Sequence, residues 1–131
     1  LDCELRALPG ARVTVVDNDS GDDSVRVIGA AIEGERWAGW ARLLASPRNG
    51  GFAAGNNFAL RDACTREGRI PQYVWLLNPD TQVRPTALRA LVEFMEAHPE
   101  VGIAGGMLEE ADGVSWPYAF RFPTLLSEVE R

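Results

Sequence analysis

The chain has 131 residues, of which 46% are hydrophobic and 24% are charged, and its formal net charge is −6. That length suits one domain, and we expect residues 1–131 to belong to a single domain. The excess of Asp and Glu argues against nucleic acid as a partner, and no run approaches the roughly 20 apolar residues of a membrane span.

The first half of the chain alternates short apolar runs with polar turns. Val13, Val15 and Val16 form a run that ends at Asp17, as in a buried parallel strand. Asp22 or Ser20 could cap the helix that follows, which Gly34 ends. A second apolar run precedes a turn-rich stretch and a helix that Gly68 should stop. The pattern therefore predicts strands at 13–17 and 41–45, and helices at 22–32 and 52–67.

The second half continues the alternation and then breaks it. Five apolar residues, Tyr73–Leu77, predict a third buried strand. Pro85 opens a predicted helix with apolar residues at helical spacing up to His98. Val101–Ala104 predict a fourth strand, and residues 107–116 predict a hairpin around Asp112 and Gly113.

Strands that alternate with helices indicate an α/β fold. We expect a Rossmann-like, mainly parallel sheet with helices on both faces. Ligands of such sheets bind at the carboxyl ends of the strands. Three polar loops, Asp17–Asp23, Asn49–Asn57 and Asn78–Thr81, leave predicted carboxyl ends and should therefore converge on one edge.

The strongest local signal is Leu77-Asn78-Pro79-Asp80-Thr81, in which a carboxylate follows a predicted buried strand directly. Mg²⁺ and Mn²⁺ need oxygen ligands and often use only one or two protein carboxylates, with phosphate and water completing the shell. Asp80 is placed for that role. The alternative is that Asn78 and Asp80 only form an Asx turn or cap the next helix.

A second cluster is Val16-Asp17-Asn18-Asp19-Ser20. Asn or Asp side chains at a strand end can bind the polar edge of a nucleobase or ribose hydroxyls, which makes Asp17, Asn18 and Asp19 candidates. The alternative is ordinary turn chemistry and helix N-terminal charge, which suffices for Asp22 and Asp23.

A third cluster is the small-residue loop Asn49–Asn57 before a helix N-terminus, where free amides and the helix dipole favour phosphate. It matches neither the dinucleotide-binding fingerprint nor the P-loop, which has a Lys. The candidates in this loop are Asn49, Gly51 and Asn56.

Taken in order, the segments VVDNDS, SPRNGGFAAGNN, YVWLLNPDT, LRALVEFMEAHPEVGIAGG, DG and RFPT closely resemble the bacterial family 2 glycosyltransferases, especially the rhamnosyltransferase-like branch. The resemblance covers nearly the whole chain. It implies a GT-A fold, in which a Rossmann-like nucleotide-binding half is fused to an acceptor half.

The resemblance also implies residue roles. Asn78-Pro79-Asp80 stands where the family has its DxD motif, with Asp80 as ligand of a divalent cation, Mg²⁺ or Mn²⁺, and Asn78 near the ribose. Asp17 and Asn18 match positions that contact the nucleotide, where Asn18 would read the base edge. The Asn49–Asn57 loop would line the nucleotide pocket.

The implied reaction is an inverting displacement that transfers a sugar from a nucleoside-diphosphate sugar, with dTDP-rhamnose as the branch-level donor, to a glycan or lipid-linked acceptor of cell-envelope polysaccharide. It would take place in the cytoplasm or at the inner face of the membrane. No residue here convincingly fills the role of general base, which the family carries beyond the point where this chain stops, and a first strand is also missing.

A chain with these parts missing should be inactive by itself and expose apolar surface. Its tail residues Phe120, Phe122, Leu125 and Leu126 would face solvent, fold back or meet another copy. One alternative is therefore a non-catalytic nucleotide-binding fragment. Another is a phosphate-accepting receiver domain, but proteins of that class have a Lys after a late strand and this chain contains no Lys.

Overall fold

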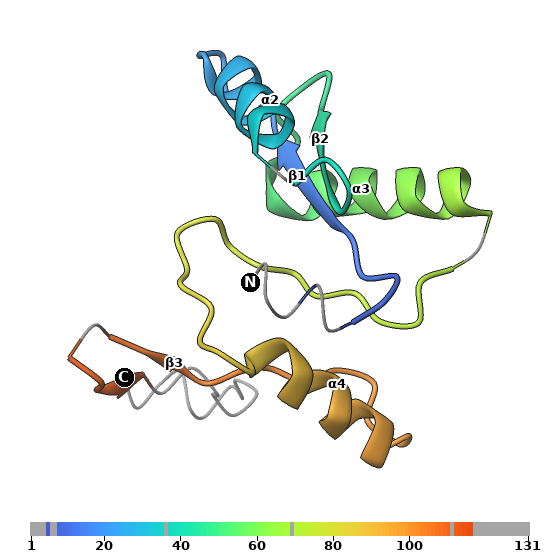
Figure 1. Cartoon of the computed structure of the whole chain (residues 1–131), viewed down its shortest axis with the longest axis vertical. Coiled ribbons are helices and arrows are strands. Elements are labelled where there is room, and N and C mark those ends of the chain that lie inside the picture. Colours follow the sequence, from blue (N-terminus) through green and yellow to red (C-terminus); the bar gives the residue numbers. More distant parts are fainter. Residues whose placement is uncertain (1–4, 6–7, 36, 69, 111, 117–131) are drawn as a thin grey trace, which may run out of the picture. The chain divides into compact units, whose positions relative to one another are not determined.

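The computed structural model describes residues 5, 8–35, 37–68, 70–110 and 112–116. The chain divides into two compact units, Leu1–Arg89 and Ala90–Arg131 (Figure 1). The elements in chain order are β1 (Val13–Asp17), α2 (Ser24–Gly34), β2 (Ala41–Ala45), α3 (Gly51–Glu67), α4 (Ala87–Ala97), β3 (Leu108–Glu109) and β4 (Ser115–Trp116). The fold is thus mixed α/β, as the sequence predicts.

The first unit is built on a parallel pair of strands. β1 lies beside β2 with Val13 opposite Ala41 and Asp17 opposite Ala45. The backbone N–H of Ser46 donates to the carbonyl of Asp17 at 2.8 Å, which extends the pairing one residue past β2. Since the strands run in the same direction, both carboxyl ends lie at one edge of the sheet.

α2 and α3 cover opposite faces of the β1–β2 sheet. Successive side chains of a strand point to opposite faces, so Leu43 faces away from Val16 and its cross-strand partner Leu44. A methyl group added at Gly29 of α2 would lie 3.8 Å from Leu43, and one added at Gly55 of α3 would lie 3.7 Å from Val16. The sheet is therefore sandwiched between α2 and α3.

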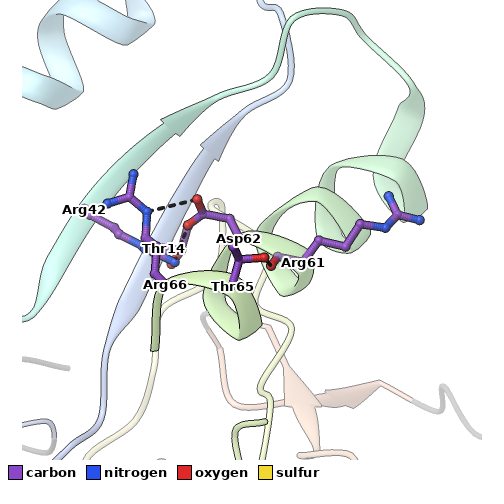
Figure 2. Close-up of polar contacts among 6 residues, drawn as sticks. All are labelled: Thr14, Arg42, Arg61, Asp62, Thr65 and Arg66. Carbon is purple, nitrogen blue, oxygen red and sulfur yellow. Dashed lines mark hydrogen bonds and ion pairs between the residues drawn. The ribbon is translucent and has the colours of Figure 1, made fainter. Parts of the chain in front are cut away.

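A polar cluster joins α3 to both strands (Figure 2). Arg42 Nη2 lies 2.8 Å from Asp62 Oδ2, and the side chains of these residues are 30% and 19% exposed. Arg42 Nε also donates to Thr14 Oγ1 at 2.9 Å, and Arg66 Nε donates to the other Asp62 oxygen at 3.0 Å. One half-buried carboxylate thereby connects α3 to β2 and, through Arg42, to β1.

The C-terminal end of α3 follows the sequence signal, but the start of α2 does not. The N-cap of α2 is Asp23, which makes no side-chain capping bond, so the prediction that Asp22 or Ser20 caps this helix is wrong. Asp22 precedes the cap, and its Oδ1 accepts the backbone N–H of Ser24 at 2.8 Å. Bonding to Ser24, first through its side chain and then through its backbone, holds the pKa of Asp22 below its ordinary value of 3.8. This bond to Ser24 therefore stabilises the start of α2 above the unfolded-state pKa of Asp22, and the stabilisation is lost as the pH falls through the lower folded-state pKa. Gly68 is left-handed, with φ 64°, and ends α3.

Two predicted strands are absent from the described residues. Neither Tyr73–Leu77 nor Val101–Ala104 forms a strand, and Leu76 and Ile103 are 51% and 91% exposed. An apolar run becomes a strand only where a neighbouring strand pairs with its backbone, and the described parallel sheet contains only β1 and β2. The prediction that Asp80 follows a buried strand is therefore wrong.

α4 begins two residues later than its proline suggests. Ala87 N donates to Arg84 O at 3.2 Å, which makes Pro85 the second residue of a turn. Thr86, the third, has φ 71°, a conformation that favours glycine. No helix among the described residues is long and apolar enough to cross a membrane.

In the second unit, the predicted hairpin is present but short. β3 and β4 are antiparallel, with Leu108 opposite Trp116, and Gly113 has φ 84° in the turn between them. The tail residues Phe120, Phe122, Leu125 and Leu126 lie outside the described residues.

We expect Asp62→Asn to lower the free energy of unfolding by about 1–2 kcal/mol, between the usual values for exposed and fully buried ion pairs. The neutral amide would leave the half-buried Arg42 without its counter-ion. Urea unfolding followed by circular dichroism would measure the change.

Asp23→Asn is the matched control, because Asp23 pairs with Arg26 on the surface at 2.7 Å with both side chains at least 70% exposed. It should change the free energy of unfolding by less than about 0.5 kcal/mol. Equal losses in the two variants would contradict a special role for Asp62.

Candidate functional site

The carboxyl end of β1 carries the most buried polar side chain of the described residues. Asp17 is 6% exposed. Its Oδ1 accepts the hydroxyl of Ser20 at 2.6 Å, and its Oδ2 accepts the backbone N–H of Ser20 at 3.3 Å. Asp19 is exposed in a left-handed conformation, with φ 60°. Asp17 therefore holds the turn in shape, while Asp19 lies on its outer surface.

Asn18 connects this turn to the start of α3. Its Nδ2 donates to Asn49 Oδ1 and to the carbonyl of Gly51, both at 3.1 Å. Asn49 Oδ1 also accepts the backbone N–H of Gly51 at 3.0 Å. The structure thus brings two of the three predicted polar clusters together, as expected for loops that leave neighbouring carboxyl ends.

Asn56 lies inside α3, within the helix predicted at 52–67 and past the loop that leads into it. Its Nδ2 donates to the carbonyl of Phe52 at 2.9 Å. One hydrogen of the Asn56 side-chain amide is therefore used in a bond within α3. Gly51 itself has φ 79°, which allows the chain to turn into α3.

Asn78 and Asp80 lie on a turn of their own. The carbonyl of Asn78 accepts the N–H of Thr81 at 3.2 Å and its hydroxyl at 2.7 Å. Both bonds use the main-chain carbonyl of Asn78, so they form a β-turn and not the side-chain Asx turn or helix cap that the sequence offered as the alternative. The Asp80 side chain is exposed and forms no hydrogen bond or ion pair with any residue that the structure describes.

The fit to a divalent cation rests on Asp80 alone. Within the described ranges there is no group of three His, Cys, Asp or Glu side chains that could hold a metal ion by themselves. A cation held by one carboxylate together with phosphate oxygens and water needs no such group. An exposed carboxylate on a fixed turn fits that donor set.

A shallow cavity of about 220 Å³ lies at the opposite edge of the sheet, at the amino ends of β1 and β2. Its lining includes Arg12, Trp40 and Arg42. Arg42 is already bonded to Asp62 and Thr14, and ligands of parallel sheets bind at the carboxyl ends. We therefore place the candidate site at the carboxyl end of β1.

The family model described as Glycosyl transferase family 2 matches residues 5–123 of the chain. The chain belongs to glycosyl transferase family 2. No curated protein and no solved structure matches it. Membership supports a glycosyltransferase of the type that uses a nucleotide-sugar donor and an acceptor.

The sequence did not predict the residues that hold this candidate site in place. Ser20 is bonded to Asp17, yet the sequence presented it only as a turn residue or a helix cap. Arg42 lies in a run interpreted as apolar, and Asp62 lies in a helix assigned from its other residues. A charged residue inside a short strand was the one signal that could have pointed to the Arg42–Asp62 pair.

Two glycines of α3 should respond in opposite ways to alanine. Gly51→Ala would place a side chain at φ 79° and should cost about 1–2 kcal/mol. At Gly55 the added methyl group would meet Asn18 at 3.5 Å, an ordinary contact, so Gly55→Ala should stabilise by up to about 1 kcal/mol through helix propensity.

Thermal unfolding of both variants beside the parent would measure these changes. A loss of stability in Gly55→Ala as large as that in Gly51→Ala would show that α3 packs on Asn18 more tightly than these distances indicate.

Proposed function

We propose that this chain binds the nucleoside-diphosphate part of a sugar donor for an inverting glycosyltransferase, at the carboxyl end of β1. One observation carries the proposal: Asn18 joins the Asp17–Ser20 turn to the start of α3 at the edge where parallel sheets bind ligands. Family 2 membership supports a nucleotide-sugar donor.

The proposed binding surface includes exposed side chains that take no part in the bonds from Asn18 to Asn49 and Gly51. Asp19 is exposed on the turn, which supports it as the side chain that would meet ribose or base. The residues that support this surface from behind are Asp17, Asn49 and Gly51. Asn56 and Asn78 remain candidates for contacts at the periphery of the nucleotide. No residue among those described is proposed as the general base.

Charge is the reason to include a cation. The segments around the site carry the carboxylates of Asp17 and Asp19. Arg48, which directly precedes Asn49 in the sequence, is exposed and carries a positive charge. A diphosphate brought to such a surface is repelled unless positive charge is supplied. We propose that Asp80 holds Mg²⁺ or Mn²⁺, which would supply positive charge to the diphosphate leaving group.

The finer assignment rests on the motif resemblance. The rhamnosyltransferase-like order of segments supports dTDP-rhamnose as donor and a glycan or lipid-linked acceptor in cell-envelope polysaccharide synthesis. The same resemblance supports a cytoplasmic location, including the inner face of the membrane. Exposed apolar side chains such as Val74 and Leu76 support self-association of the chain.

Asp80→Asn tests the cation site. With Mn²⁺ present, the parent should bind thymidine diphosphate about tenfold or more tightly than the variant does, and EDTA should remove that difference. The isosteric amide keeps the turn, so thermal stability should change by less than about 0.5 kcal/mol. Titration calorimetry measures the affinities.

Asp23→Asn is the control, because it removes an exposed carboxylate from the same unit without touching the Asn78–Thr81 turn. It should keep the Mn²⁺ dependence of the parent. Equal affinities of Asp80→Asn and parent in Mn²⁺ would reject Asp80 as the ligand. Failure of the parent to bind any nucleoside diphosphate would reject donor binding by this chain.

A further inference from the structure

The carboxamide of Asn18 is enclosed by α3. Its two Nδ2 hydrogens have two acceptors, Asn49 Oδ1 and the carbonyl of Gly51, each at 3.1 Å. On its other side, a methyl group added at Gly55 would lie 3.5 Å from both Cγ and Oδ1 of Asn18. The amide therefore lies between the first residue of α3 and the second turn of the same helix.

The orientation of this amide is fixed by the chemistry of its neighbours. Turning it over would bring Oδ1 against two acceptors, since Asn49 Oδ1 already receives the Gly51 N–H and the Gly51 carbonyl has no hydrogen to give. In the observed orientation Oδ1 is buried and has no partner among the described residues. Neither end of the amide is therefore free to pair with a nucleobase, since both Nδ2 hydrogens are already donated and Oδ1 is buried.

We propose that Asn18 is a positioning residue that locks the start of α3 to the end of β1, and that it does not itself select the base. The inference rests on the proposed donor binding at this edge. Base preference would then come from side chains on the outer surface, and Asn18 would act on every nucleotide equally through the position of the Asn49–Gly51 segment.

The hydrogen bond between Asn18 and Asn49 has a fixed donor and a fixed acceptor, which a test can exploit. Asn18 must donate and Asn49 must accept, so removal of either group should free Gly51, while an acceptor of the same shape at position 49 should keep it fixed. Asn49→Asp is that conservative variant, because a carboxylate oxygen can accept from both Asn18 and the Gly51 N–H. A negative charge is also tolerated at a helix N-terminus.

The test compares Asn18→Ala, Asn49→Ala, their double variant and Asn49→Asp in the full chain. Hydrogen exchange of the Gly51 N–H, followed by NMR, should accelerate roughly fivefold in Asn49→Ala, a typical factor for loss of one hydrogen bond. In Asn18→Ala it should accelerate by a smaller factor, because the Gly51 N–H keeps its acceptor but the Asn49 side chain is no longer held by Asn18. The double variant should exchange faster than Asn49→Ala by less than the factor that Asn18→Ala gives alone, because the two single variants share the loss of the Asn18–Asn49 bond. Asn49→Asp should keep the parental rate.

Binding of thymidine, uridine and guanosine diphosphates in Mn²⁺ supplies the second readout. In Asn18→Ala the three affinities should fall together by roughly three- to tenfold, with their ratios unchanged within about twofold. Affinity is compared only between the alanine variants and the parent, since the charge of Asn49→Asp would itself repel a diphosphate.

A shift of more than about fivefold in the ratio between thymidine and guanosine diphosphates in Asn18→Ala, with Gly51 exchange unchanged, would overturn the proposal and make Asn18 a base reader. Accelerated exchange in Asn49→Asp equal to that in Asn49→Ala would also overturn it. If the parent binds no nucleotide, donor binding fails, and the exchange rates still decide whether Asn18 locks α3.

Discussion

The parallel pairing of β1 with β2 determines where the other parts of the first unit lie. It places Asp17 and Ala45 opposite each other, so that the turn after β1 and the loop after β2 leave the same edge. It also sets Thr14 beside Arg42 on the α3 face, where Asp62 can reach Arg42. A slip of one residue in this register would move Arg42 to the face covered by α2.

α3 is fixed at two points along its length. Near its start, Asn18 donates hydrogen bonds to Asn49 and to the Gly51 carbonyl, and farther along, Asp62 forms an ion pair with Arg42 of β2. One contact alone would allow the helix to swing about that point, whereas two contacts on different turns fix its direction across the sheet. The site at the carboxyl end of β1 therefore depends on an ion pair that contacts no proposed ligand.

The local patterns of the sequence predict β1, β2 and α3 closely. The apolar runs that form the strands and the glycine that ends α3, Gly68, depend only on residues a few positions away in the sequence. They fail at Tyr73–Leu77, where apolarity is visible in the sequence but the need for a pairing strand is not. They also miss contacts between distant residues: Asn18 and Asn49 are 31 residues apart, and only the fold brings them together. Turn chemistry at Asn18 is readable from sequence, but its bonding partner is not.

The connection between the two strands also bears on the order in which this unit assembles. Thr14 and Arg42, which meet across the ladder, are 28 residues apart, so pairing them closes a long loop at an entropic cost. α2 occupies 11 of the intervening residues. Once its first turn has formed, the helix shortens the flexible segment whose ends must meet for the strands to pair. We therefore expect α2 and the strand ladder to form together in the transition state for folding, with α3 joining afterwards.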